Sequence, residues 1–230
     1  SPFKSFIFSL LFWLFILKIF IKKFKFQYIM NHLQMETKHV CKDMLYFHLI
    51  NRRCGKMKKA VFLDRDGVIN EVLTDRVKFV NKPKDLYFLP GVPEAIKKLN
   101  EVFDYVFVVT NQGGVGLGFM KEVELQKIHE HMIAELKKKG AIIHEAVYCP
   151  HKPKAGCQCR KPKSKLILDL AEKYNVNLAQ SYMVGDTDTD IIAGKNAGTK
   201  GVFLGKSDPL ADAILPNLLS AAEWIIKDAQ

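Results

Sequence analysis

Acidic residues are scarce at the start of this 230-residue chain, and their scarcity accounts for most of its net charge of +11. Residues 1–56 contain ten Lys and Arg residues but only Glu36 and Asp43, which gives this segment a net charge of +8. Residues 57–230 contain 25 basic and 22 acidic residues, so their net charge is only +3. A nucleic-acid-binding domain concentrates positive charge on its folded surface. Because the excess lies in residues 1–56, we expect no nucleic-acid partner.

The first segment also lacks the small-residue cleavage site of a secretory signal peptide. Its apolar run, residues 6–21, is shorter than the ~20 residues that a membrane-spanning helix usually needs. Lysines follow the run, so a genuine anchor there would leave the rest of the chain in the cytoplasm. Met57 begins a sequence typical of a cytosolic domain. We therefore predict two parts: residues 1–56, as translated upstream sequence or a membrane anchor, and residues 57–230, as a cytoplasmic globular domain.

The apolar runs of residues 57–230 lack the strict alternation of strands that have one solvent-exposed face. They are continuous over four to six residues, as expected for parallel strands covered on both faces. Amphipathic helical patterns separate them. Strands that alternate with helices predict an α/β fold with a doubly wound, mostly parallel sheet. The predicted strands are 60–64, 105–110, 145–149, 182–186 and 201–205, and the predicted helices are 93–102, 121–138, 163–174 and 188–197.

Three of these predicted strands end in polar residues instead of continuing as apolar sequence. In doubly wound sheets, ligands bind beyond the carboxyl ends of the strands. The strand ends therefore predict one polar site. It would contain Asp64 and Asp66 from the first strand, Thr110, Asn111 and Gln112 from the second, and Asp186 from the fourth.

Carboxylates dominate this predicted site. Asp64 and Asp66 are separated by one residue, so their side chains can point the same way. Together with Asp186 they would form an oxygen-rich site suited to Mg²⁺, with Asp190 in support. The alternatives are that residues 64–67 form only a polar turn with a local ion pair, and that residues 187–188 simply cap the next helix.

The same groups suit phosphoryl transfer. Packed acids repel one another unless a cation relieves them, and a metal beside a carboxylate suits an anionic substrate. One aspartate can attack phosphorus covalently, while the other protonates the leaving oxygen and then activates water. The phosphoryl oxygens also need fixed donors and positive charge. We expect these from the Thr110 hydroxyl, the Asn111 backbone N–H and Lys161.

Cysteine is rare in the chain, at five residues, yet three cysteines and one histidine gather in a single short stretch. Three thiolates and one imidazole form a closed ligand set that suits tetrahedral structural zinc. A disulfide is the alternative, which a chain without export signals disfavours. The zinc would shape a loop that delivers Arg160 and Lys161 to the phosphate. The predicted ligands are Cys149, His151, Cys157 and Cys159, whereas His129, His131 and His144 are expected to be packing or surface residues.

Taken together, four motifs resemble the haloacid dehalogenase (HAD) superfamily of phosphatases in their order and spacing. The closest resemblance is to the D-glycero-D-manno-heptose 1,7-bisphosphate 7-phosphatases and the related histidinol-phosphate phosphatases, and it covers Met57 to about residue 205. The motifs are DRDGVIN (64–70), VVTNQGG (108–114), CPH with CQCRKP (149–162) and VGDTDTD (184–190).

The resemblance implies a role for each motif residue. It implies that Asp64 is the nucleophile and Asp66 the general acid and base. Mg²⁺ would be held by Asp64, the Asp66 backbone carbonyl and Asp186. Thr110 and Lys161 would stabilise the phosphoryl group. The substrate-binding residues would be Asn111, Gln112, Gly113 and Arg160.

Residues 71–92 and 113–148 are too short for the inserted cap domains of this superfamily, so we expect a capless, HAD-like fold with a small zinc loop. Two departures from heptose phosphatases remove positive charge: residues 113–119 lack an arginine, and Thr187 stands where a lysine is common. We expect a Mg²⁺-dependent phosphatase that forms an aspartyl-phosphate and removes the 7-phosphate of heptose 1,7-bisphosphate. The alternatives are histidinol phosphate or another small sugar phosphate as substrate, or a non-catalytic, zinc-bearing module that binds phosphate.

Overall fold

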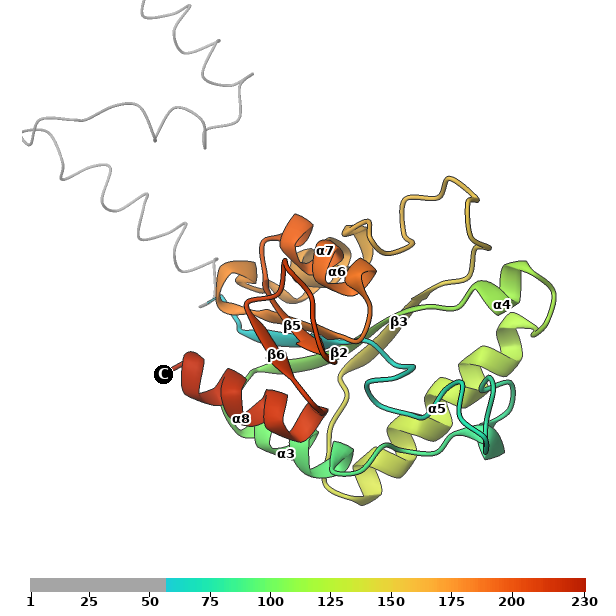
Figure 1. Cartoon of the computed structure of the whole chain (residues 1–230), viewed down its shortest axis with the longest axis horizontal. Helices are drawn as coiled ribbons and strands as arrows, with labels where there is room; N and C mark the ends of the chain where they lie inside the picture. Colours follow the sequence, from blue (N-terminus) through green and yellow to red (C-terminus); the bar gives the residue numbers. More distant parts are fainter. Residues whose placement is uncertain (1–56) are drawn as a thin grey trace, which may run out of the picture. The chain divides into compact units, whose positions relative to one another are not determined.

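The computed structural model describes residues 57–230, so the predictions for residues 1–56 lie outside the described residues. Six strands form one sheet in the order β3-β2-β1-β4-β5-β6, and every neighbouring pair is parallel (Figure 1). Helices cover both faces of the sheet, which confirms the predicted α/β fold. The strands are β1 (Ala60–Leu63), β2 (Tyr105–Asn111), β3 (Glu145–Cys149), β4 (Tyr182–Gly185), β5 (Lys200–Leu204) and β6 (Ala213–Leu215).

The four predicted helices are present within two residues of their expected ends. The C-cap of α7 is Gly198, where a φ of 96° satisfies the left-handed conformation that favours glycine. The α-helices are α3 (Val92–Val102), α4 (Gly113–Gly116), α5 (Glu122–Lys138), α6 (Lys165–Tyr174), α7 (Asp188–Ala197) and α8 (Leu218–Asp228), with short 3₁₀ helices η1 (Pro83–Asp85) and η2 (Leu178–Gln180).

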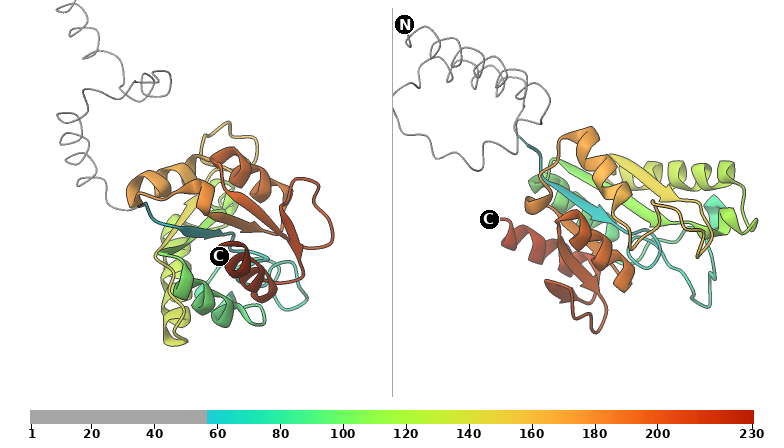
Figure 2. Two further views of the ribbon diagram at one scale, coloured as in Figure 1. Left: turned by 90° about the vertical axis from the view of Figure 1, so that its left-hand side faces the viewer. Right: turned by 90° about the horizontal axis from the view of Figure 1, so that it is seen from above.

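Two hydrophobic cores lie on opposite faces of the sheet. Successive residues of β1 alternate between them: Val61 and Leu63 belong to the core under α3, α5 and α8, and Ala60 and Phe62 to the core under α6 and α7. Helices α3 and α8 lie side by side on the first face (Figure 2). Because both faces are covered, the strand residues are apolar without interruption, as the sequence pattern predicted.

The strand order determines where the site lies in the fold. The chain moves outward from β1 to β3 on one side and from β4 to β6 on the other, so the direction reverses between β1 and β4. Leu63 at the end of β1 is in register with Val108 of β2 and Val184 of β4. Ligands of doubly wound sheets bind in the crevice at such a reversal. The polar residues that follow these strands therefore meet there.

In residues 57–230, the connections near this crevice contain no inserted cap domain, as expected for a capless fold. Within the described residues, the segment between β1 and α3 contains only η1 as a helix, and α4 and α5 connect β2 to β3. No helix in residues 57–230 combines the length and the apolar character required to cross a membrane.

Candidate active site

Three carboxylates from two strand ends and one helix form the centre of the site. Asp64 follows β1, Asp186 follows β4 and Asp190 lies in the first turn of α7, and each offers an oxygen within 4.8 Å of the others. The Oδ1 atom of Asp186 is buried without a hydrogen-bond partner. Burial raises the pKa of Asp64 to about 6 despite the nearby Lys161. Burial and the two neighbouring carboxylates raise the pKa of Asp186 to about 7.

An unsatisfied oxygen among mutually repelling carboxylates is an arrangement that a hard cation such as Mg²⁺ relieves. The donors present therefore fit the predicted magnesium. The carboxylate of Asp66 lies outside this cluster, and that of Asp190 lies within it. The contribution of the Asp66 backbone carbonyl stays a prediction.

Two glycines allow the carboxylates to approach the strand ends. A Cβ atom on Gly67 would lie 2.0 Å from Oδ2 of Asp186, and the φ of Gly67 is +83°. A Cβ atom on Gly185 would lie 2.1 Å from the Cβ of Asp190. A side chain at either position would displace an aspartate, so these close contacts require glycine at both positions.

Lys161 is buried among these acids, with 3% of its surface exposed. Its Nζ donates to Oδ1 of Asp64 at 2.8 Å and to the Val109 carbonyl at 2.7 Å, and it lies 2.5 Å from Oδ1 of Asp190. Burial alone would lower the pKa of Lys161, but the two carboxylates raise it above its ordinary value. The ammonium is therefore charged and fixed beside Asp64.

Asn111 holds the backbone of Lys161 in place. Its Oδ1 accepts from the Lys161 N–H at 3.0 Å, and its Nδ2 donates to the Lys161 carbonyl at 3.2 Å. Asp190 is fixed in a comparable way, because its Oδ2 accepts from the backbone N–H and the hydroxyl of Thr187. Thr187 thus caps α7, as one sequence alternative predicted, and Asp190 both pairs with this cap and faces the site.

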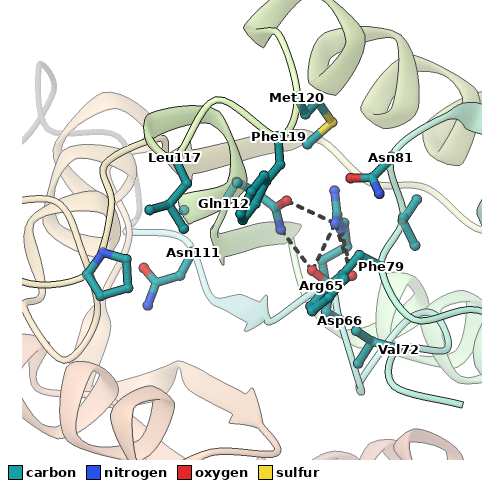
Figure 3. Close-up of a pocket in the computed structure, with 14 residues that line it drawn as sticks. Arg65, Asp66, Val72, Phe79, Asn81, Asn111, Gln112, Leu117, Phe119 and Met120 are labelled. Carbon is teal, nitrogen blue, oxygen red and sulfur yellow. Dashed lines mark hydrogen bonds and ion pairs between the residues drawn. The ribbon is translucent and has the colours of Figure 1, made fainter.

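The Asp66 carboxylate turns toward a second buried group, Arg65. Nη2 of Arg65 lies 2.8 Å from Oδ2 of Asp66, and Nε lies 3.1 Å from Oδ1 (Figure 3). Asn70 and Gln112 also donate to this carboxylate, at 2.9 and 2.8 Å. Burial alone would raise the pKa of Asp66, but Arg65 and these donors hold it below its usual range.

This network includes further residues of the predicted site. The side-chain amide of Gln112 donates to Oγ1 of Thr110 at 2.9 Å, and Arg65 donates to Oε1 of Gln112 at 3.0 Å. Arg65 is only 1% exposed. The sequence suggested Arg65 only as part of a local ion pair in one alternative for residues 64–67, and its central position was not predicted, although a charged residue between two site aspartates was a usable signal.

His129 packs against this network and is not a metal ligand among the described clusters. Its Nε2 lies 3.3 Å from Nη1 of Arg65, and its ring meets Tyr148 edge-on. Burial and the Arg65 charge lower the pKa of His129 to about 3, so the ring is neutral. Nδ1 of His144 accepts from the Val106 backbone N–H at 3.1 Å. The prediction that these histidines are packing or surface residues is confirmed, because His129 is buried and His144 is exposed.

A pocket of about 580 Å³ opens beside the Arg65–Asp66–Gln112 network. It contains Asp66 and Asn111 and extends toward the connection between α4 and α5. The lining residues are Arg65, Asp66, Val72, Phe79, Val80, Asn81, Asn111, Gln112, Gly113, Gly114, Leu117, Phe119, Met120 and Pro153.

The second predicted metal site is also assembled. Cys149, His151, Cys157 and Cys159 each offer one donor atom, all within 4.8 Å of one another. The Sγ of Cys149 lies 3.6 Å from that of Cys157 and 3.3 Å from that of Cys159, and all three thiols are free. Sulfur ligands 2.3 Å from a tetrahedral zinc would be about 3.8 Å apart. The cluster therefore fits a single zinc ion better than a disulfide.

Arg160 follows this cluster directly and lies at the edge of the pocket. Its Nη1 donates to the His151 carbonyl at 3.4 Å, and a Cβ atom on Gly113 would lie 3.3 Å from the same nitrogen. The structure thus brings every predicted site residue either to the aspartate cluster, to the Asp66 network, to the pocket or to the cysteine cluster.

Comparison with known proteins identifies the family. A family model described as HAD-hydrolase-like matches residues 158–217. A D-glycero-beta-D-manno-heptose-1,7-bisphosphate 7-phosphatase of Rhodopseudomonas palustris is 38% identical over 151 residues, which cover 63% of this chain and 82% of that protein. A D-glycero-alpha-D-manno-heptose-1,7-bisphosphate 7-phosphatase of Photorhabdus laumondii is 33% identical over 181 residues, which cover 74% of this chain and 97% of that protein. The chain belongs to the D-glycero-D-manno-heptose-1,7-bisphosphate 7-phosphatase family.

A solved structure agrees with this family. The D,D-heptose 1,7-bisphosphate phosphatase of Bordetella bronchiseptica, complexed with magnesium and phosphate, superimposes with a TM-score of 0.66. It is 32% identical and covers 74% of this chain and 99% of its own. The predicted resemblance to HAD superfamily phosphatases, which are phosphoric monoester hydrolases, is confirmed.

Proposed function

We propose that this protein removes the 7-phosphate of D-glycero-D-manno-heptose 1,7-bisphosphate through an aspartyl-phosphate formed on Asp64. The observation that carries the proposal is the buried Asp64 carboxylate, which lies beside Lys161 and two further aspartates at the reversal point of the sheet. The heptose phosphatase relatives and the magnesium- and phosphate-bound neighbour support the substrate and the metal. The reaction belongs to carbohydrate metabolism.

In the first half-reaction, an oxygen of Asp64 attacks phosphorus while the bond from phosphorus to the sugar oxygen breaks. Asp66 gives a proton to the leaving oxygen. Asp66 lies two residues beyond Asp64 in the chain and is held by Arg65, Asn70 and Gln112. These contacts fix the orientation of its carboxyl group. The bound phosphate carries negative charge, which favours protonation of Asp66 before transfer.

In the second half-reaction, Asp66 accepts a proton from water as the water oxygen attacks phosphorus. Phosphate leaves and the Asp64 carboxylate is restored. Lys161 and the Thr110 hydroxyl stabilise the negative charge on the phosphoryl oxygens, and fixed donors of this kind contribute most when they need no rearrangement. Asn111 serves this step by holding Lys161 in place, and Arg160, Gln112 and Gly113 border the substrate.

Mg²⁺ would be held by Asp64, the Asp66 backbone carbonyl and Asp186, with Asp190 in support. When bound, it supplies positive charge that screens the approach of the Asp64 carboxylate to the phosphate. Zn²⁺ would be held by Cys149, His151, Cys157 and Cys159 and would fix the loop that leads into Arg160 and Lys161. This second role is structural, because the four donors fill a tetrahedral zinc ion.

We further propose that residues 57–230 form the phosphatase domain and that it works in the cytoplasm. The three cysteines of the cluster form no disulfide, which suits a reducing compartment. The heptose names of the relatives favour heptose bisphosphate over histidinol phosphate as the substrate. A non-catalytic phosphate-binding module would need neither a buried nucleophile nor a positioned acid.

The test measures phosphate release with Mg²⁺ from both anomers of heptose 1,7-bisphosphate and from histidinol phosphate. Asp64→Asn should lower turnover of the preferred heptose anomer by at least about 10³-fold, as removal of a nucleophile does in other enzymes. Asp169→Asn makes the same chemical change on the exposed face of α6 and should leave turnover unchanged. Preference for histidinol phosphate would refute the substrate, and an active Asp64→Asn variant would refute the mechanism.

A further inference from the structure

The side chain of Gln112 lies between two groups that the proposed reaction uses, the Asp66 carboxylate and the Thr110 hydroxyl. Gln112 follows β2 directly, and only 6% of its surface is exposed. Its side-chain nitrogen donates to Oδ2 of Asp66 at 2.8 Å and to Oγ1 of Thr110 at 2.9 Å. Its Oε1 accepts from Nη2 of Arg65 at 3.0 Å (Figure 3). One buried amide therefore connects the proposed acid to a proposed phosphoryl donor.

The charged neighbours of Gln112 fix the orientation of its amide. A side-chain amide has two N–H donors and one carbonyl acceptor. The Arg65 guanidinium can only donate, so it faces Oε1, and the ionised Asp66 carboxylate can only accept, so it faces the NH₂ group. The reverse orientation would oppose donor to donor and acceptor to acceptor. Both N–H groups and the carbonyl oxygen of Gln112 are thus bonded within the protein.

This orientation also determines what the Thr110 hydroxyl can do. Thr110 is only 1% exposed, and a hydroxyl group has one hydrogen and two lone pairs. Because the Gln112 nitrogen donates, it occupies a lone pair of Oγ1 and leaves the hydroxyl hydrogen available to another acceptor. The proposed reaction requires Thr110 as a donor to the phosphoryl oxygens. The contact with Gln112 therefore holds Thr110 in the role of donor.

The contact with Asp66 differs from the other contacts of this carboxylate in its span along the chain. Arg65 and Asn70 lie one and four residues from Asp66, so they fix the carboxylate relative to its own turn. Gln112 lies 46 residues away and ties Oδ2 of Asp66 to the end of β2, where Thr110 also lies. Gln112 therefore sets the position of the acid relative to the phosphoryl donor.

We propose that Gln112 is a positioning residue, which holds the Asp66 carboxyl group and the Thr110 hydroxyl in one fixed relation to the phosphoryl group at Asp64. Through Asp66 it aligns proton transfer to the leaving oxygen, and through Thr110 it aligns a donor to the phosphoryl oxygens. Its side chain acts on the rate of phosphoryl transfer and not on the affinity for the sugar. This inference rests on the proposed function, since it assumes the roles given there to Asp64, Asp66 and Thr110.

The first test measures kcat and KM of Gln112→Met for heptose 1,7-bisphosphate in the presence of Mg²⁺. Methionine has a similar length but neither donors nor a carbonyl acceptor. We expect kcat to fall by about 10- to 100-fold, because small misplacements of reacting groups have effects of this size. KM should change by less than about twofold, because the interaction is made in the transition state. A raised KM with an unchanged kcat would assign the Gln112 side chain to substrate binding and overturn the proposal.

Gln180→Met is the matched control for this substitution. Gln180 is an exposed residue of η2, which precedes β4 and so lies at the amino end of that strand, opposite the site. The control should leave kcat and KM unchanged.

The second test changes the leaving group. p-Nitrophenolate is a stable anion that needs little protonation as it departs, so p-nitrophenyl phosphate depends little on the general acid. Gln112→Met should lower kcat for this ester by only about fivefold, through the misaligned Thr110 hydroxyl. The much larger loss with the heptose ester then reports on Asp66. A variant whose fold is damaged would lose activity equally toward both esters, and equal losses would overturn the proposal.

A double-mutant cycle tests the connection to Thr110. Thr110→Val replaces the hydroxyl with a methyl group of similar size. When Gln112→Met is added to Thr110→Val, kcat for p-nitrophenyl phosphate should fall by less than about twofold further, because coupled residues have non-additive effects. A further fivefold loss, equal to that in the wild-type background, would overturn the proposal for Thr110. Release from neither ester by the wild-type protein would refute the proposed function as well, whereas wild-type release with an unchanged kcat in Gln112→Met would overturn this proposal alone.

Discussion

Substitution of Lys161 by methionine perturbs the buried charges at the centre of the site. The wild-type ammonium lies 2.8 Å from Oδ1 of Asp64 and 2.5 Å from Oδ1 of Asp190, and it is almost completely buried. Methionine keeps a similar volume but removes the charge and the donors. Removal of one partner from a buried ion pair costs about 3–5 kcal/mol. A domain of this size is typically stable by about 5–15 kcal/mol, so the variant should fold but lose much of its stability.

The loss of stability in Lys161→Met should be larger at high pH than at low pH. Burial already raises the pKa of Asp64 to about 6 with Lys161 present, and removal of the ammonium raises it further. A carboxyl group whose pKa is higher in the folded than in the unfolded state loses stability as the pH rises through the folded pKa. At pH 5, Asp64 is largely protonated in both proteins. At pH 8, only the variant has a buried Asp64 carboxyl group without its cationic partner. The difference in free energy of unfolding between the variant and the wild-type protein is therefore larger at pH 8 than at pH 5.

Urea unfolding followed by far-UV circular dichroism, in buffer without Mg²⁺ at pH 5 and pH 8, measures this difference. Lys165→Met is the matched control, because Lys165 pairs with Asp169 on the exposed surface of α6. The control should show no measurable loss, since exposed i,i+4 pairs contribute little. The reasoning fails if Lys161→Met is no less stable than the control at pH 8, or if its deficit is greater at pH 5.

Two further substitutions test close contacts and the cysteine cluster. Gly67→Ala should lower stability by more than the ~1 kcal/mol of a left-handed alanine and should strongly reduce turnover, because its Cβ meets Asp186 at 2.0 Å. Gly118→Ala has a similar φ of +79° with open space around it, and equal effects of the two on unfolding and turnover would disprove the contact argument. Cys157→Ser should release zinc, measured by atomic absorption, and lower turnover by about 10- to 100-fold, whereas the neighbouring Gln158→Ser should do neither. A zinc-free, fully active Cys157→Ser variant would refute the role of the loop.

The strands of the central sheet could be predicted because each is a short, continuous apolar run that helical patterns separate. The elements at the β6 edge of the sheet were harder to predict. Strand β6 (Ala213–Leu215) has three residues, none of them buried, so its apolar signal is weak. Helix α8 (Leu218–Asp228) carries a usable pattern, with buried Leu218, Ala221, Ala222 and Ile225 on one face, and was missed.

The orientation of Asp64 and Asp66 could not be predicted from strand periodicity alone. Residues two apart in a strand share a face, which favoured one shared orientation for Asp64 and Asp66. The strand ends at Leu63, however, and Gly67 turns the chain with a positive φ. Asp66 therefore leaves the strand geometry and turns to Arg65, while Asp190 of α7 reaches the cluster instead.

By itself, the sequence determined the type of fold and the inventory of reactive groups: the aspartates at strand ends, Lys161, and three cysteines with one histidine. These follow from local patterns of polarity and spacing, which neighbouring residues set. The tertiary structure alone decided which of these groups touch. Lys161 meets Asp64 across 97 residues of chain, and Gln112 meets Asp66 across 46. Phe79 and Phe119 likewise line one pocket although they belong to two separate segments of the chain. Contacts across such separations depend on how the helices and strands pack, which local sequence patterns do not specify.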